Sequence, residues 1–270
     1  MSKTKKNIVP SIRRPAALLV AILFQASIMI SHPTLAQIKQ TSPVSIEANV
    51  SLEWDQNKGV YIAIGDAVVE QDAKRLKADE IIARYDLSSK SRDLTDVSAT
   101  GSVVFIDGEN VAQGAKLDYR IGDETYYLSG PGAIVTSPRG VMTATGSITY
   151  DASNIQKKQV VALGTASYRD DNGRVIEGEQ VVALLDEEGT IEAIHAEGSA
   201  KVVTPKGIVA TADRLDYTAA TDRADLFGNV EIIDRDNILR GARAEVEFDK
   251  EISRLLSDDT GKRVSGVLNS

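Results

Sequence analysis

The amino-acid sequence predicts an all-β protein of antiparallel strands, and two observations lead to this prediction. In Gly241–Asp249, small or apolar side chains alternate with charged ones, so an extended strand there has one apolar and one charged face. No stretch after residue 40 has a convincing helical apolar stripe, because even 73–84 alternates at Ile81 and Ala83 like a strand. Strands of this kind need an apolar partner surface, and we expect the rest of the chain to supply it.

The first thirty-six residues have the composition of a secretory signal peptide. A basic start is followed by the apolar run Ala16–Ile30 and by the small residues of Thr34–Ala36, which precede Gln37. The run is short for a membrane span and has no charged stop-transfer flank. We therefore expect residues 1–36 to be cleaved and the mature chain to be exported, with an uncleaved membrane anchor as the alternative.

The charge of the mature chain argues against one class of partner. Residues 1–36 contain five of the 31 Lys and Arg residues and none of the 39 Asp and Glu residues, which leaves a formal charge of −13. A surface of this charge repels nucleic acid, so we expect no nucleic-acid partner. The chain has no cysteine, so an oxidising compartment brings neither disulfides nor thiol chemistry.

A repeat of about 32 residues runs through the mature chain. In each unit an alternating strand ends in an aromatic residue or leucine, usually with Asp after it. The seven marks, which are 31 to 35 residues apart, are Trp54, Tyr85, Tyr119, Tyr150, Leu185, Tyr217 and Phe248. Stacked units of this kind predict a single domain of about seven repeats over residues 37–270.

Each unit has a second mark, a glycine that precedes a short strand-like run. These glycines are Gly65, Gly101, Gly132, Gly164, Gly198 and Gly228. Glycine inside a strand pattern is typical of a bulge or a sharp bend. We therefore expect the strands to turn a corner at these glycines.

The apolar faces have two interpretations. In Val44–Trp54 every second residue is apolar, which predicts one long first strand, and later units add similar residues in the same phase. Two such apolar strips can pack on each other as a closed core. They can also splay apart and leave a groove with room for an acyl chain. The sequence pattern does not separate these interpretations.

The sequence offers no active site. His195 is the only histidine after residue 36, and its place in an ordinary strand pattern favours a structural role. The carboxylate pairs Asp170–Asp171, Glu187–Glu188 and Asp258–Asp259 lie in turn-like stretches, where such residues are usually solvated. There is no GxSxG, HExxH, phosphate-binding loop or GGxGxD calcium repeat. We expect neither an enzyme nor a metal or cofactor site.

Four stretches of the chain point to a family: Pro43–Ala48, Ala78–Ile82, Tyr168–Gly178 and Gly261–Val264. Together with the Gly-x-Ala/Val strands they resemble the LptA/OstA family of lipopolysaccharide-transport proteins, over essentially the whole mature chain. The resemblance implies a repetitive antiparallel β-jellyroll whose two facing sheets form a V-shaped open trough. It also implies a periplasmic, non-catalytic bridge that shields the acyl chains of lipid A and carries lipopolysaccharide from an inner-membrane donor to an outer-membrane acceptor.

The resemblance also indicates partners and a binding site. We expect the open strands at the two ends, Val44–Trp54 and Ala242–Phe248 with Val264–Leu268, to pair with the donor, the acceptor or a second copy in a head-to-tail arrangement. The expected lipid-binding lining of the trough is Val44, Ile46, Leu52, Trp54, Tyr85, Tyr119, Tyr150, Tyr168 and Phe248.

Three other functions remain open from the sequence. The membrane-anchored donor subunit of the same pathway would keep residues 1–36 uncut. A polysaccharide-acting enzyme on a parallel β-helix would need carboxylates aligned on one face of adjacent units. A surface fibre would use the same open edges for assembly.

Overall fold

The computed structural model describes residues 44–89, 92–153, 158–250, 252–257 and 263–267. Within these ranges the chain forms eighteen β-strands and one short 3-10 helix, and all strand pairs are antiparallel. The predicted all-β class is therefore confirmed. The predicted signal peptide, residues 1–36, lies outside the described residues.

The first half of the chain contains β1 to β10: Ser45–Glu47, Ser51–Asp55, Val60–Gln71, Lys74–Tyr85, Leu94–Asp107, Asn110–Arg120, Thr125–Ser129, Ala133–Ser137, Gly140–Ala144 and Ser147–Asp151. The second half contains β11 to β14, η1 and β15 to β18: Lys158–Asp170, Val175–Leu185, Ile191–Val203, Val209–Thr218, Ala219–Thr221, Arg223–Asp234, Asn237–Glu247, Ile252–Leu256 and Ser265–Val267.

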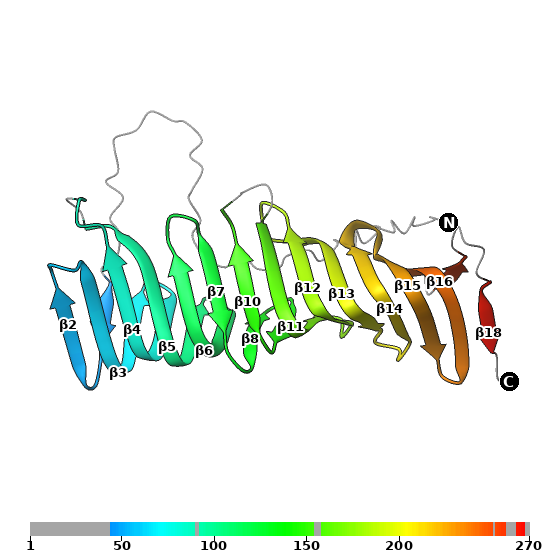
Figure 1. Ribbon diagram of the computed structural model, residues 1–270, viewed down its shortest axis with the longest axis horizontal. Coiled ribbons are helices and arrows are strands. Elements are labelled where there is room, and N and C mark those ends of the chain that lie inside the picture. The colour runs from blue at the N-terminus through cyan, green and yellow to red at the C-terminus, as the bar shows by residue number, and fades with distance from the viewer. Residues whose placement is uncertain (1–43, 90–91, 154–157, 251, 258–262, 268–270) are drawn as a thin grey trace, which may run out of the picture.

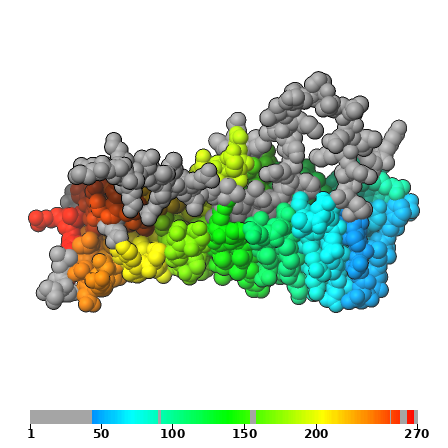
Figure 2. Space-filling model, turned by 180° about the vertical axis from the view of Figure 1, so that it is seen from behind, coloured from blue at the N-terminus to red at the C-terminus, as the bar shows by residue number. Residues whose placement is uncertain are grey.

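The strands stack into a long array that follows the order of the chain. Figure 1 shows β2 at one end, β18 at the other and the remaining strands roughly side by side between them. The opposite side shows the same progression, from the N-terminal strands in blue to the C-terminal strands in orange and red (Figure 2). This arrangement follows from the repeat, because each unit pairs with the units before and after it.

The hydrogen-bond register divides the array into two sheet halves. We call half A the half that contains the short strands β2, β7, β10 and β17, and half B the half that contains β1, β8, β9 and β18. Each long strand contributes one segment to each half. In β11, for example, Gln159–Leu163 pairs with β10 in half A and Ser167–Asp170 pairs with β9 in half B.

Glycine bulges join the two halves. Five long strands shift register at a glycine whose successor also has a positive φ, and these pairs are Gly65-Asp66, Gly101-Ser102, Gly164-Thr165, Gly198-Ser199 and Gly228-Asn229. The predicted bends are thus confirmed at five of the six marked glycines. The sixth, Gly132, lies between β7 and β8, where two separate strands replace one bent strand.

One apolar core fills the space between the two halves. Buried side chains of both halves belong to a single cluster, in which Ala99, Ala162 and Ala196 are 0% exposed. Such small side chains allow close approach, and larger ones such as Leu215 and Leu226, also 0% exposed, fill the remaining space. Much of the predicted apolar strip is therefore packed core.

The prediction of one long first strand is wrong. Val44–Trp54 forms two short strands, β1 and β2, which are separated at Ala48–Val50, opposite the bulge at Gly65 in β3. Among the described residues, β2 is the end strand of half A and pairs with β3 alone. For that reason Val50 and Leu52 keep 75% and 56% of their surface exposed.

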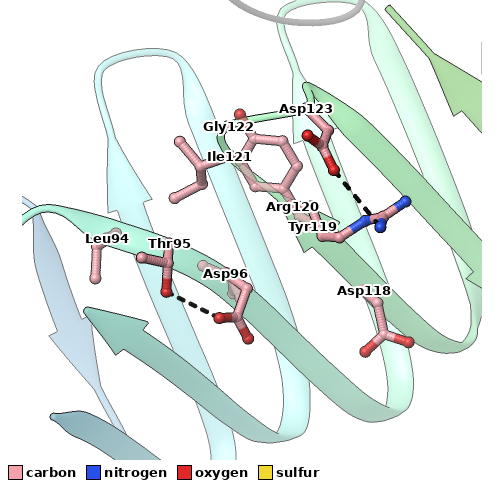
Figure 3. A pocket seen from close by; sticks show the side chains of 10 residues that line it. Leu94, Thr95, Asp96, Asp118, Tyr119, Arg120, Ile121, Gly122 and Asp123 are labelled. Carbon is pink, nitrogen blue, oxygen red and sulfur yellow. Dashed lines mark hydrogen bonds and ion pairs between the residues drawn. The ribbon is translucent and has the colours of Figure 1, made fainter. Parts of the chain in front are cut away.

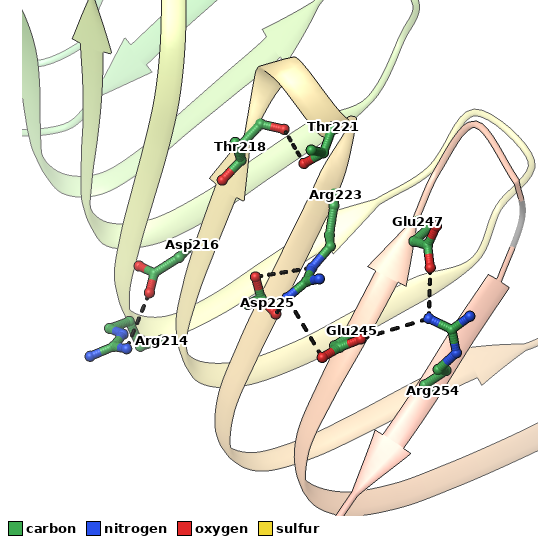
Figure 4. A network of polar contacts seen from close by, with 9 residues as sticks. All are labelled: Arg214, Asp216, Thr218, Thr221, Arg223, Asp225, Glu245, Glu247 and Arg254. Atoms are coloured by element: carbon green, nitrogen blue, oxygen red, sulfur yellow. Dashed lines mark hydrogen bonds and ion pairs between the residues drawn. The ribbon is translucent and has the colours of Figure 1, made fainter.

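The outer face of half A is a ladder of charges. Within β15, Arg223 pairs with Asp225 at 2.6 Å, and it lies 3.6 Å from Glu245 on the adjacent β16 (Figure 4). Arg254 of β17 lies 2.7 Å from Glu247 of β16. The predicted charged side of Gly241–Asp249 therefore points away from the core. Pairs this exposed contribute little to stability, but they keep the outer surface polar and the register fixed.

Candidate functional site

The seven residues that mark the repeat gather in one row. Each lies within two residues of the end of a half-A strand segment, at the end away from the glycine bulges. We call this set the rim row: Trp54, Tyr85, Tyr119, Tyr150, Leu185, Tyr217 and Phe248. It places large apolar groups along one long edge of the core.

The nine predicted lining residues differ in exposure. Three are buried at 6 to 8% exposure: Tyr85, Tyr150 and Tyr168. Three are half-buried and pack on the core: Ile46, Tyr119 and Phe248. Three are exposed by 44 to 56% at the N-terminal end: Val44, Leu52 and Trp54. The set thus includes core residues, residues at the margin of the core and exposed residues in or beside the end strands β1 and β2.

At the N-terminal end, Trp54 and Tyr85 belong to one aromatic group. The indole Nε1 of Trp54 donates a hydrogen bond to the Tyr85 hydroxyl at 3.0 Å. Tyr61, which is not among the nine predicted lining residues, has its ring centroid 5.6 Å from that of Trp54 and 5.4 Å from that of Tyr85. The guanidinium of Arg92 lies 4.9 Å from the centre of the Trp54 ring.

In the middle of the array, Tyr126 connects the two halves. Its ring stacks on Tyr119 at 4.0 Å and lies 6.2 Å from both Tyr150 in half A and Phe105 in half B. Burial raises the pKa of Tyr150 to about 12 and raises the pKa of Tyr126 further, so both phenols are neutral at physiological pH. The alternation of apolar residues did not single out Tyr126, because β7 is short and the adjacent Tyr127, also aromatic, faces outward.

Towards the C-terminal end, Arg174 reaches from half B to half A. Its guanidinium forms a 2.8 Å ion pair with Asp222 and lies 4.1 Å from the Phe248 ring centre and 4.9 Å from that of Tyr217. Tyr217 donates a hydrogen bond to the same carboxylate at 3.0 Å. Burial by itself lowers the pKa of Arg174, but the neighbouring Tyr217 and Asp222 outweigh it and raise the pKa. The side chain therefore remains charged although it is only 10% exposed.

Two cavities lie between the halves, the first lined almost entirely by apolar groups and the second by apolar and charged side chains together. A cavity of about 40 Å³ is lined by Met142, Ile148, Tyr150, Tyr168 and Leu185, together with neighbouring side chains. A cavity of about 180 Å³ has Ile208, Val246 and Phe248 in its wall, with Arg174 and Lys206 beside them. Two of the predicted lining residues thus meet at the first cavity, and a third lines the second.

A hollow of about 610 Å³ lies at the turn between β6 and β7, and its wall combines the predicted lining residue Tyr119 and the apolar Ile121 with several charged side chains (Figure 3). Its charged groups have partners: Asp96 pairs with Arg84 at 2.8 Å, Asp118 with Lys116 at 2.6 Å, and Arg120 with Asp123 at 3.5 Å. Neutralised pairs of this kind do not form an acid–base or nucleophilic arrangement. This hollow is a surface groove at the rim of half A, where Tyr119 of the rim row meets charged side chains of the outer face.

The predicted structural role of His195 agrees with its surroundings. Its Nδ1 lies 2.8 Å from Asp216, which also pairs with Arg214 at 3.1 Å on the outer face. Within the part of the chain that the structure describes, no group of three or more His, Cys, Asp or Glu side chains could hold a metal ion. Among the same residues, no helix is long and apolar enough to cross a membrane.

Comparisons with known proteins identify the family. The family described as LptA/(LptD N-terminal domain) LPS transport protein matches residues 45–156 and again residues 152–252, so two successive parts of the chain fit it. The curated proteins gave no match.

Among solved structures, one match is LptH from Pseudomonas aeruginosa, described as the LptA-homologous periplasmic component of the lipopolysaccharide transport device. The identity is 13% and the TM-score 0.20, over 85% of this chain and 96% of that chain. The family match covers most of the described residues and does not depend on this structure. The chain belongs to the LptA/(LptD N-terminal domain) family of lipopolysaccharide transport proteins.

Proposed function

We propose that the chain is a periplasmic bridge that carries lipopolysaccharide from an inner-membrane donor to an outer-membrane acceptor, without catalysis. Residues 37–270 form one domain of about seven repeats in this proposal, and residues 1–36 are the cleaved export signal. The two sheet halves form a trough along whose open side the acyl chains of lipid A are shielded from water.

The observation that supports this proposal best is the rim row. It repeats the same kind of side chain along the whole array, and several members are only half covered, among them Tyr119, Tyr217 and Phe248. An enzyme would need one unit that differs chemically from the others, whereas a conduit needs similar units in succession. Repetition is therefore what transport along the array requires.

The energetics of lipid transport agree with an apolar conduit. Each methylene kept from water is worth about 0.8 kcal/mol, so one acyl chain of about 12 carbons exposed in the periplasm would cost roughly 10 kcal/mol. Similar units offer similar contact energies at successive positions. A chain can then move stepwise along the array without a single deep trap.

The proposed lipid contacts keep the nine predicted residues but assign them different roles. Half-buried Ile46, Tyr119 and Phe248 touch acyl chains directly. Buried Tyr85, Tyr150 and Tyr168 become accessible when the halves separate. Exposed Val44, Leu52 and Trp54 serve at the N-terminal end, where lipid enters or leaves. The newly found Tyr61, Phe105 and Tyr126 join this lining.

The strands at the two ends support the proposed partners. Among the described residues, β2 at one end and β17 and β18 at the other each pair with one strand only. The prediction that Ala242–Phe248 is an open end strand is wrong, because β16 pairs with β15 on one side and with β17 on the other. Apolar side chains at both ends are exposed, among them Val50 at 75% and Val267 at 53%. Edges of this kind pair with another strand. The donor, the acceptor and a second copy of this chain are the partners we propose for them.

Depletion in cells tests the transport role. When synthesis of the protein is stopped, newly made lipopolysaccharide is expected to accumulate in the inner-membrane fraction, and a plasmid copy should restore its arrival at the outer membrane. A copy with Arg240→Gln, which changes only an exposed ion pair with Glu231, serves as the matched control. An unchanged distribution of lipopolysaccharide after depletion would overturn the proposal.

A further inference from the structure

Among the described residues, Arg174 forms the one ion pair in which a buried side chain joins a turn of half B to a turn of half A. It directly precedes Val175, the first residue of β12 in half B, whereas Asp222 lies in the turn between β14 and β15 in half A. Most other ion pairs among the described residues join side chains of one strand, one turn or two neighbouring strands on exposed surfaces. This pair therefore bridges the core rather than following the sheet.

The surroundings of Arg174 hold it in this position. The rings of Phe248 and Tyr217 lie against its guanidinium, and the backbone N–H of Arg174 donates to Asp170 at 2.8 Å within its own turn. Asp170 Oδ2 also lies 3.7 Å from Nε. Cation–π contacts strengthen when water is excluded, and a buried charge pair is costly to break one partner at a time. The contact has the properties of a closed latch.

The latch occupies the path that a lipid would follow. Tyr217 and Phe248, on which the guanidinium rests, are two successive members of the rim row, and the cavity of about 180 Å³ begins beside them. An acyl chain moving along the rim row towards β17 meets Arg174 before it reaches Ser253 in the far wall of that cavity. Asp170 and Asp222 already neutralise the guanidinium, so the site as it stands does not attract an anion.

We propose that Arg174 and Asp222 form a latch that closes the conduit in its C-terminal third and must open before an acyl chain passes. The claim that lipid passes the latch rests on the proposed transport function. The claim that the pair holds the two sheet halves together does not depend on lipid. The two claims can therefore be tested separately.

The first experiment measures, without lipid, the distance between the two turns that Arg174 and Asp222 join; we call this distance the gap. The chain has no cysteine, so spin labels can be attached at cysteines introduced for Asn172 and Ala220, exposed residues of the two turns that the latch joins. Double electron–electron resonance on the full mature protein is expected to give one narrow distribution of distances between the two labels. Arg174→Gln should broaden and lengthen it, with the open fraction rising about tenfold or more, because a charged hydrogen bond is lost.

Two further variants keep this test decisive if Arg174→Gln folds poorly. Asp222→Asn leaves Arg174 on its aromatic rings but removes the charge pair, and should open the gap in the same way. Arg240→Gln removes an exposed pair on the outer face and should leave the distribution unchanged. Identical distributions in the unaltered protein, Arg174→Gln and Asp222→Asn would overturn the latch.

The second experiment follows lipid past the latch. A photoreactive residue at Ser253, beyond the latch, is compared with one at Tyr119, before it, during incubation with purified lipopolysaccharide. Arg174→Gln and Asp222→Asn should raise capture at Ser253 several-fold relative to Tyr119. A widened gap with an unchanged capture ratio would overturn the gating role. A widened gap with no capture at either position in any variant would leave the latch standing and refute the transport function instead.

Discussion

The glycine bulges determine how the strands fold over the core, and Gly228→Ala tests this most sharply. Gly228 has φ +76°, a left-handed conformation in which a Cβ costs roughly 1–2 kcal/mol. The added Cβ would also lie 2.2 Å from Oδ2 of Asp213. Displacing that carboxylate disturbs its contacts with the Asn229 amide at 3.0 and 3.3 Å, worth about 1 kcal/mol. The expected loss of unfolding free energy is therefore about 2–3 kcal/mol.

Gly173→Ala is the matched control for this prediction. Gly173 has φ +88°, but a Cβ there would meet nothing within 4 Å, so only the backbone strain of roughly 1–2 kcal/mol is expected. In an Asp213→Ala background the crowding at Gly228 disappears, and Gly228→Ala should then cost about as much as Gly173→Ala. Urea unfolding followed by circular dichroism measures all four variants. If Gly228→Ala costs no more than Gly173→Ala in the unaltered background, the reasoning about the bulge is refuted.

Two further predictions concern the core and its buried phenols. Leu226→Ala removes a side chain with 0% exposure and should lower the unfolding free energy by about 2–5 kcal/mol. Leu52→Ala, at 56% exposure, should lower it by less than about 1 kcal/mol. Equal losses in urea unfolding would contradict a packed interior at β15. Burial raises the pKa of Tyr150 from its ordinary value of 10 to about 12, so the folded state binds more protons than the unfolded state in this interval and stability falls as the pH rises through it. Tyr150→Phe should reduce that alkaline slope by about one proton per molecule, and unfolding curves at pH 9 to 12 that match the unaltered protein would contradict the assignment.

The repeat made much of the fold predictable from the sequence. The aromatic or leucine marks become the rim row, and five glycine marks become bulges, because a period of about 32 residues places equivalent residues at equivalent positions of stacked units. Alternation within each unit correctly predicts which side chains point inward, as with Ala244 and Val246. These features depend on local patterns that every unit repeats.

The remaining features depend on contacts between units or between halves. The first stretch keeps its alternation through Val44–Trp54, yet it breaks into two strands because its neighbour β3 has a bulge at Gly65. Arg174 and Asp222 are 48 positions apart in the sequence and meet only because the two halves face each other. No local pattern in the sequence reports either fact.

Capture of lipid along the rim row tests the central claim most directly. A photoreactive residue is placed in cells at Tyr119 or Phe248, which are half-buried beside the core, and at Glu245 on the charged outer face. After irradiation, the purified protein is probed for covalently attached lipopolysaccharide. The account predicts adducts at Tyr119 and Phe248 and none at Glu245. A folded, exported protein that gives no adduct at either inner position, or as much at Glu245, would contradict it.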